Sequence, residues 1–115
     1  MEKKRKSKRM SLKVYLKVFD RKTDQLFGYL VDITNEGIMV TSEQPIKTEA
    51  TFQLRLILPT EIEGSKQFSF SAISMWGKKD SDSGFYNNGF QFSNLSTKDV
   101  QIIEQLIQKF CFKTD

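Results

Sequence analysis

The sequence predicts a small antiparallel β-barrel with one C-terminal helix, and three observations support this fold class. The 115 residues suffice for one domain with a single hydrophobic core. Six short runs between turn signals are predicted to form strands, and in two of them, 12–18 and 51–58, apolar and polar residues alternate as they do in half-buried strands. A last run instead repeats its apolar residues at helical spacing. Six consecutive strands would leave exposed edges unless the sheet closed on itself, so a barrel is expected.

The six strands are predicted from this alternation and from the turns between them. In the run from Leu12 to Val18 the even-numbered residues are all apolar, and we expect them to face the core. Pro59 should end the fourth strand, and a polar loop around Gly64 should follow it. The predicted strands span residues 12–18, 26–33, 37–41, 51–58, 68–76 and 85–92.

Residues 96–112 are predicted to form the helix that packs against the barrel. Ser96 is a favourable N-cap, and Asp99 three residues later approximates a capping box. The only cysteine, Cys111, falls in the last turn, where we expect a hydrophobic packing role. The predicted apolar stripe consists of Val100, Ile103, Leu106, Ile107 and Phe110.

The positive charge is concentrated at the N-terminus. The chain has 18 Lys and Arg against 14 Asp and Glu, a net charge of +4. Residues 1–10 hold six of the basic residues and one acid, so the rest of the chain has a net charge of −1. These ten residues lack apolar periodicity, and we expect a solvated arm there, followed by the barrel domain over residues 11–115. An anionic partner should meet the arm first.

The composition argues against an enzyme, a metal site or a cofactor. There is no histidine, the commonest acid–base residue near neutral pH, and one cysteine cannot build a zinc site. Asp20 and Asp24 fall in a predicted polar turn as solvated charges, and Asp80 with Asp82 offers too few ligands for calcium. No phosphate-binding glycine motif of the Walker type is present.

A cytoplasmic location is expected. No apolar run approaches the roughly 20 residues of a membrane span. The basic start does not lead into an apolar stretch, so no signal peptide is predicted. A single cysteine cannot form an internal disulfide, which is typical of a reducing compartment.

Two segments carry residues suited to binding an anionic purine ligand. Arg5 and Arg9 precede the first strand, and a guanidinium can bind phosphate or the O6/N7 edge of guanine with two parallel hydrogen bonds. Asp32 and Thr34 are two apart on an extended segment, so they face one side while Val31 and Ile33 should face the core. A structural interpretation is also open for each segment. The arm could be generic positive charge, and Asp32–Gly37 could be a turn in which Gly37 takes a positive φ.

Together these segments resemble the PilZ domain family. Arg5-x-x-x-Arg9 followed by Asp32-x-Thr34-x-x-Gly37 is similar to the family's two signatures, and Asn88–Phe92 is similar to its Gly-apolar-x-Phe segment. The resemblance implies a six-stranded barrel with a C-terminal helix, which binds cyclic di-GMP through Arg5, Arg9, Asp32, Thr34 and Gly37. Thr34 replaces the usual Ser, and Glu36 adds a negative charge to the turn, so both could lower affinity.

The expected function is therefore that of a bacterial second-messenger receptor, which transmits its signal to an unidentified downstream protein through ordering of the arm. Two alternatives stay open. One is a PilZ-like protein-interaction module without ligand, whose arm contacts anionic membrane. The other is a small nucleic-acid-binding barrel, for which Tyr15 between Lys13 and Lys17 is the one aromatic cluster with basic neighbours. The net charge of −1 outside the arm argues against nucleic acid.

Overall fold

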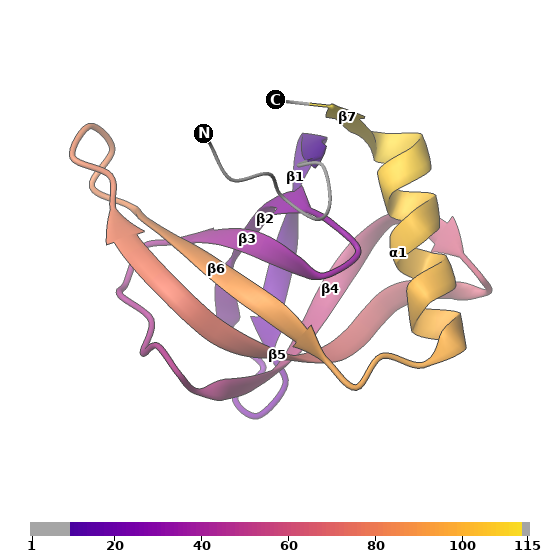
Figure 1. The fold of residues 1–115 in the computed structure, drawn as a ribbon, viewed down its shortest axis with the longest axis horizontal. Helices are drawn as coiled ribbons and strands as arrows, with labels where there is room; N and C mark the ends of the chain where they lie inside the picture. Colours follow the sequence, from indigo (N-terminus) through magenta and orange to yellow (C-terminus); the bar gives the residue numbers. More distant parts are fainter. Residues whose placement is uncertain (1–9, 114–115) are drawn as a thin grey trace, which may run out of the picture.

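In a computed structural model, which describes residues 10–113, six antiparallel strands close into a barrel and one helix packs against it (Figure 1). The barrel runs in the order β2-β3-β6-β5-β4-β1 and closes where β1 pairs with β2. The predicted fold class is confirmed. The elements are β1 (Met10–Asp20), β2 (Leu26–Ile33), β3 (Gly37–Ser42), β4 (Thr51–Ile62), β5 (Ser65–Lys79), β6 (Tyr86–Ser93), α1 (Thr97–Phe110) and β7 (Cys111–Lys113).

One continuous core fills the barrel and extends beneath α1. Along β4, Leu54, Leu56 and Leu58 are all buried, as the alternation predicts. Phenylalanines supply much of the remaining volume in two groups of three, with ring centroids 5.0–6.5 Å apart. These groups are Phe27, Phe52 and Phe90, and Phe68, Phe70 and Phe92.

A bulge interrupts β1 near its start. The four residues Leu12–Tyr15 lie opposite the single residue Val31 of β2, and regular pairing resumes after them. Val14 and Tyr15 are 54% and 65% exposed. The expectation that Val14 faces the core was wrong, because extra residues in a strand break the alternation of its faces.

The β4–β5 hairpin is longer than predicted, because its turn has only two residues. Glu63 and Gly64 have φ values of 51° and 78°, the positive values of a type I′ turn. Ile62 and Ser65 pair directly across this turn, so the predicted polar loop is largely strand. Pro59 does not end β4 as expected. The ladder to β5 is irregular around it, and proline is tolerated at such a bulge.

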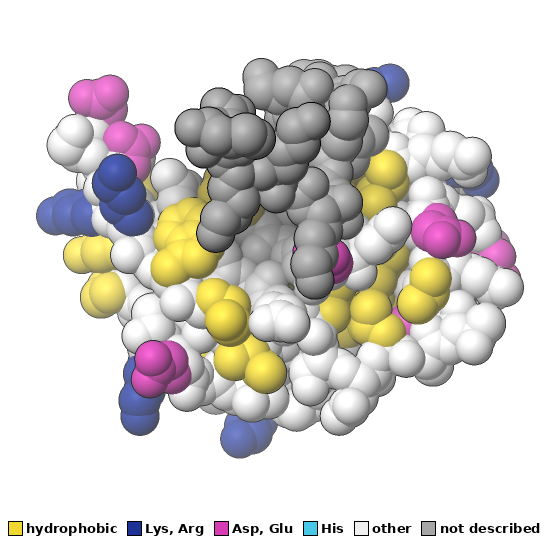
Figure 2. Space-filling model, viewed as in Figure 1, with side chains coloured by type: hydrophobic (Ala, Val, Ile, Leu, Met, Phe, Trp, Pro, Cys, Tyr) yellow, Lys and Arg dark blue, Asp and Glu magenta, His cyan; other side chains and the backbone are white. Residues whose placement is uncertain are grey.

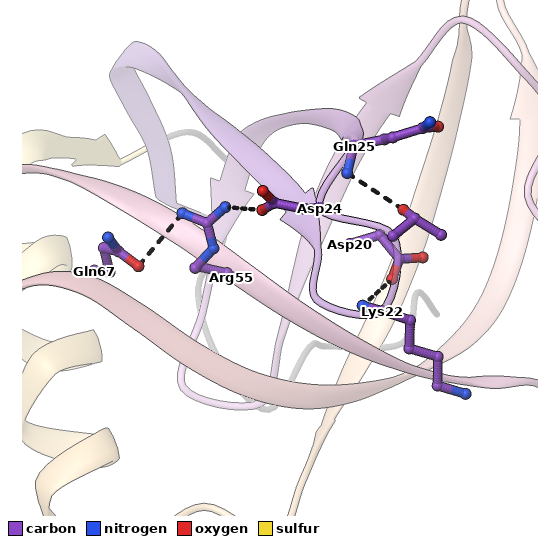
Figure 3. Close-up of polar contacts among 7 residues, drawn as sticks. Asp20, Lys22, Asp24, Gln25, Arg55 and Gln67 are labelled. Carbon is purple, nitrogen blue, oxygen red and sulfur yellow. Dashed lines mark hydrogen bonds and ion pairs between the residues drawn. The ribbon is translucent and has the colours of Figure 1, made fainter.

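Polar contacts fix the β1–β2 turn to the outside of the barrel (Figure 3). Asp20 Oδ1 accepts a hydrogen bond from the Lys22 amide at 2.8 Å. Arg55 of β4 donates to Asp24 at 2.6 Å and to Gln67 of β5 at 3.3 Å. Although the Asp24 side chain is 80% exposed, it is ion-paired and not the purely solvated charge that the sequence predicted.

The helix begins as predicted. Ser96 Oγ accepts from the Asp99 amide and the Asp99 carboxylate accepts from the Ser96 amide, both at 3.0 Å, which completes the capping box. Ile103 and Leu106 are buried against the barrel, but Val100 is 37% exposed and lies at the margin of the packed face. No helix within residues 10–113 has the length and apolar content needed to cross a membrane.

The helix ends at Phe110, two residues earlier than predicted, and continues directly into β7. Cys111 has an extended backbone and pairs with Leu12, so the expectation that it lies in the helix was wrong. Met10, assigned to the arm from sequence, is the first residue of β1 and pairs with Lys113. A strand of three residues is too short to show a periodicity in the sequence.

Candidate ligand-binding site

Thr34 organises the tight turn between β2 and β3. Its Oγ1 accepts hydrogen bonds from the amides of Glu36 and Gly37, each at 3.1 Å. The Thr34 amide donates to the Gly37 carbonyl at 2.9 Å, which closes the turn. The hydroxyl proton has only a long contact of 3.4 Å to the same carbonyl. The Thr34 oxygen is therefore used by the fold, while its O–H remains a weakly engaged donor.

Gly37 is required by close packing. The expectation of a positive φ was wrong, since Gly64 and Gly84 are the glycines with that conformation in the described chain. A Cβ on Gly37 would instead collide with the backbone carbonyl of Phe90 on β6. The Phe92 amide also donates to the Glu36 carbonyl at 2.9 Å, so the turn lies directly against β6.

Asp32 belongs to a row of residues that crosses four neighbouring strands on the outside of the barrel. Asp32 pairs with Met39 of β3, Met39 with Gly89 of β6, and Gly89 with Trp76 of β5. Directly opposed residues present their side chains on the same face. We call this set the outer row. Ile33, next to Asp32, is only 1% exposed and faces inward as predicted. Val31 lies at a bulge of β2 outside the core cluster and lines a hollow on the outer surface, so the expectation that it faces the core was wrong.

Two hollows flank the outer row, and Asp32 and Met39 line both of them. The first has a volume of about 570 Å³ and also contacts Trp76 and the Thr34–Gly37 turn. The second, of about 710 Å³, is lined by aromatic residues of β1, β2 and the β5–β6 loop. Those aromatic residues are Tyr15, Tyr29 and Phe85.

The first hollow brings together the described part of the predicted site. Asp32, Thr34 and Gly37 all line it, and Glu36 lines it as well. Arg5 and Arg9 lie outside the residues that the structure describes. The sequence analysis missed Trp76 and Met39, because their place beside Asp32 depends on strand register. The sequence offers one weak signal, since Trp76 is the only tryptophan, but its 45% exposure within a strand is visible only in the structure.

The described lining of the first hollow contains two carboxylates, those of Asp32 and Glu36, and no Lys or Arg. On the face of the molecule that Figure 2 shows, apolar side chains gather toward the middle, and the described Lys and Arg side chains lie mostly near the rim. Among residues 10–113, no three Cys, Asp or Glu side chains are grouped so as to hold a metal ion. The described walls therefore offer hydrogen-bond acceptors and apolar surface, but no cationic group for an anion.

Cys111 of β7 lies close enough to Asp32 for the carboxylate to influence its thiol. Burial raises the pKa of Cys111 to about 11, and the Asp32 charge adds to this effect while Lys13 opposes it. The thiol is therefore protonated at neutral pH. The strand register places β7 at the Asp32 end of the site, because Ser11 of β1 pairs with Asp32 on one side and with Phe112 of β7 on the other.

The family model of the PilZ domain matches residues 3–112. The chain belongs to the PilZ family. Among solved structures, this PilZ domain is similar to the inhibitor of motility MotI/DgrA of Bacillus subtilis, with a TM-score of 0.73 and 18% identity. It is also similar to the PilZ domain of YcgR from Escherichia coli with c-di-GMP, with a TM-score of 0.70 and 16% identity. A third similar structure is the MrkH–c-di-GMP complex of K. pneumonia, with a TM-score of 0.72 and 15% identity.

Each alignment covers 94% of this PilZ domain. It spans 92% of the YcgR domain but about half of the other two chains, 51% of MotI/DgrA and 52% of MrkH. At these identities the likeness establishes the shared fold. No curated protein sequence matches the chain.

Proposed function

We propose that this PilZ domain is a receptor for cyclic di-GMP, which binds in the first hollow between the outer row and the Thr34–Gly37 turn. The observation that carries the proposal is the outer row itself. It places a carboxylate, a flexible thioether and an exposed indole side by side in a fold whose neighbours YcgR and MrkH were solved with this ligand. The domain acts by binding and needs neither catalysis nor a cofactor.

The described residues suit a guanine base. The Asp32 carboxylate can accept from the ring N–H and the amino group of guanine, a charge-assisted pair of hydrogen bonds. Trp76 is 45% exposed and offers an aromatic face on which a purine can stack. The O–H of Thr34, weakly engaged within the turn, supplies one further donor.

The phosphates of cyclic di-GMP require cations that the described walls of the first hollow do not contain. The arm supplies them, because Arg5 and Arg9 can bind phosphate in a bidentate manner and stack on a base. The chain enters the barrel at this place, since Met10 and Ser11 pair with Ile33 and Asp32. The described fold thus begins beside the hollow, at Met10 opposite Ile33.

The two departures from the family pattern act on affinity and not on the mode of binding. Thr34 keeps the hydroxyl that holds the turn, and its methyl group adds bulk beside the base. Glu36 is exposed, so its repulsion of a phosphate is screened by water and salt. Ordering of the arm around the ligand then changes the surface offered to a downstream protein.

Isothermal titration calorimetry with cyclic di-GMP tests the proposal. The double variant Arg5→Lys with Arg9→Lys keeps the net charge but removes the planar, bidentate groups, so we expect at least a tenfold loss of affinity, about 1.4 kcal/mol. The control Lys3→Gln, Lys4→Gln and Lys6→Gln should bind nearly normally, with a weaker salt dependence. No heat of binding to the wild type refutes the proposal. Normal binding by the lysine variant and failure of the glutamine variant would show that the arm acts as diffuse charge.

A further inference from the structure

The first residues of β1 are held between two strands that otherwise do not meet. On one side Met10 and Ser11 pair with the Asp32 end of β2, and on the other side Met10–Leu12 pair with β7. The bulge at Leu12–Tyr15 follows immediately and interrupts the ladder to the rest of β2. The backbone of the segment Met10–Leu12, which we call the junction, is therefore paired only with its two neighbours among the described strands, while the buried Leu12 side chain anchors its end in the core.

Of these two neighbouring strands, β7 is the less firmly held. It has three residues, and among the described strands it pairs with β1 alone at the end of the sheet. So short an edge strand opens at a low free-energy cost compared with the buried strands of the core. It follows α1 without a connecting loop, because Phe110 ends the helix and Cys111 begins the strand.

Charge provides a second link between β7 and the ligand site. Asp32 and Lys13 act in opposite directions on the pKa of the Cys111 thiol, so each of these two charges lies within electrostatic reach of that thiol. The backbone register and this electrostatic contact agree in placing β7 next to Asp32, with only the junction between them.

We propose that β7 opens and closes together with the Asp32 end of the ligand site, and that this coupling carries the ligand's presence to the C-terminal end of α1. A ligand that holds Asp32 and orders the chain entering at Met10 stabilises the junction, which in turn stabilises β7. The ligand-dependent part rests on the proposed function. The coupling between β7 and Asp32 is a property of the ligand-free fold and is tested without ligand.

Cys111 is a natural reporter of β7 opening because it is the only cysteine. In closed β7 the thiol is half-buried with a pKa near 11, so it reacts slowly with an alkylating reagent at pH 8. Opening exposes the thiol and lowers its pKa toward 9.0, which speeds alkylation. Saturating cyclic di-GMP should slow the alkylation of Cys111 at least fivefold, measured by mass spectrometry. At a ligand concentration that saturates the wild type but not Asp32→Ala, the alkylation rate of that variant should change much less relative to its own ligand-free rate.

Two truncations test the coupling in the ligand-free protein. Deleting residues 112–115 removes two of the three β7 residues but keeps Cys111, whereas deleting residues 114 and 115 leaves β7 whole. We expect the longer deletion to speed both Cys111 alkylation and hydrogen exchange at the Asp32 and Ile33 amides at least fivefold. Exchange in the core of β4, at Leu54 and Leu56, is the internal reference for global unfolding. The shorter deletion should change neither rate by more than twofold.

Thermodynamic reciprocity makes the test quantitative. Suppose that the protein with closed β7 binds the ligand more tightly than the protein with open β7 by a given factor. Saturating ligand must then slow the alkylation of Cys111 by that factor. The longer deletion must weaken ligand affinity by up to the same factor. Unchanged exchange at Asp32 and Ile33 in that deletion overturns the coupling, whether or not any ligand binds. Calorimetric binding without a change in alkylation overturns the transmission of the signal to β7. Absence of binding alone refutes the proposed function and leaves the exchange experiment to decide the coupling.

Discussion

The indole of Trp76 on β5 lies over the bare backbone of Gly89, its partner on β6. A Cβ on Gly89 would overlap the indole ring, so the absence of a side chain at Gly89 leaves the space that the indole occupies. This contact sets the height of the indole beside Met39 and Asp32. The depth of the first hollow therefore depends on a residue that contributes no side chain to it.

Gly89→Ala should displace the indole and damage the site without unfolding the barrel. We expect a shift of the tryptophan emission spectrum and about tenfold weaker binding of cyclic di-GMP, ~1.4 kcal/mol. Gly77→Ala is the matched control, because Gly77 pairs with Asn88 and, as the next residue along β5, lies on the opposite face of the sheet from Trp76. Its Cβ would meet Asn88 Oδ1 at 3.0 Å. Equal emission and affinity in both variants would contradict the role assigned to Gly89.

Asp32 and Thr34 should differ in what their truncation disturbs. Asp32→Ala removes a charged acceptor, so binding should weaken by about 1.5–3 kcal/mol. Thr34→Ala leaves the Glu36 and Gly37 amides without their acceptor, so it should also lower the free energy of unfolding by about 1–3 kcal/mol. Thr34→Ser keeps that oxygen and should bind as well as the wild type or better. Calorimetry and urea unfolding separate these outcomes, and equal, negligible effects of both truncations on binding would make the turn purely structural.

Leu106 should be one of the more costly core positions to truncate. Its side chain is fully buried where α1 meets the barrel, so Leu106→Ala should cost about 2–5 kcal/mol in urea unfolding. Val100→Ala on the same helix should cost much less, because Val100 is 37% exposed. A loss below about 0.5 kcal/mol for Leu106→Ala would mean that the helix does not pack as described.

Cys111 should make the fold less stable in alkaline solution. Its pKa is about 11 in the folded protein against 9.0 for an unperturbed thiol, so the unfolded chain loses this proton first as the pH rises. The contribution of the protonated Cys111 thiol to the free energy of unfolding is complete below pH 9 and is lost as the pH rises through about 11. Between these values the midpoint of urea unfolding should fall further for the wild type than for Cys111→Ala. Parallel curves would show that the thiol titrates equally in both states.

Several elements of the fold were predictable from local signals, although the local signals of Pro59 and Gly64 wrongly predicted a loop where β4 and β5 continue. The alternation in β4 identified the buried face of that strand, and Ser96 with Asp99 identified the start of α1, because each depends on residues a few positions apart. The bulge at Leu12–Tyr15 and strand β7 could not be predicted in this way. Both exist through pairing between distant segments, and that pairing leaves no periodic trace in the sequence.

The candidate site likewise contains residues that a local segment predicts and residues that only strand register brings together. Asp32, Thr34 and Gly37 were found because they form one short segment. Trp76 and Met39 join them through the registers of three strand pairs, which no spacing in the sequence reveals. The positive φ expected of Gly37 was wrong for a related reason. Glycine is required at this position because a side chain would collide with the Phe90 carbonyl on another strand, and not because its own turn needs a positive φ.

The pairing of Met10 with Lys113 has an architectural consequence. Opposed residues on antiparallel strands lie about 5 Å apart, so a polypeptide that enters this fold at one of them leaves it at nearly the same point. Such a unit can be inserted into a loop of another protein without forcing the host's two halves apart. Any host sequences fused at these positions would run side by side from the barrel. A conformational change at the Met10–Lys113 pair would then alter the positions of both fused sequences together.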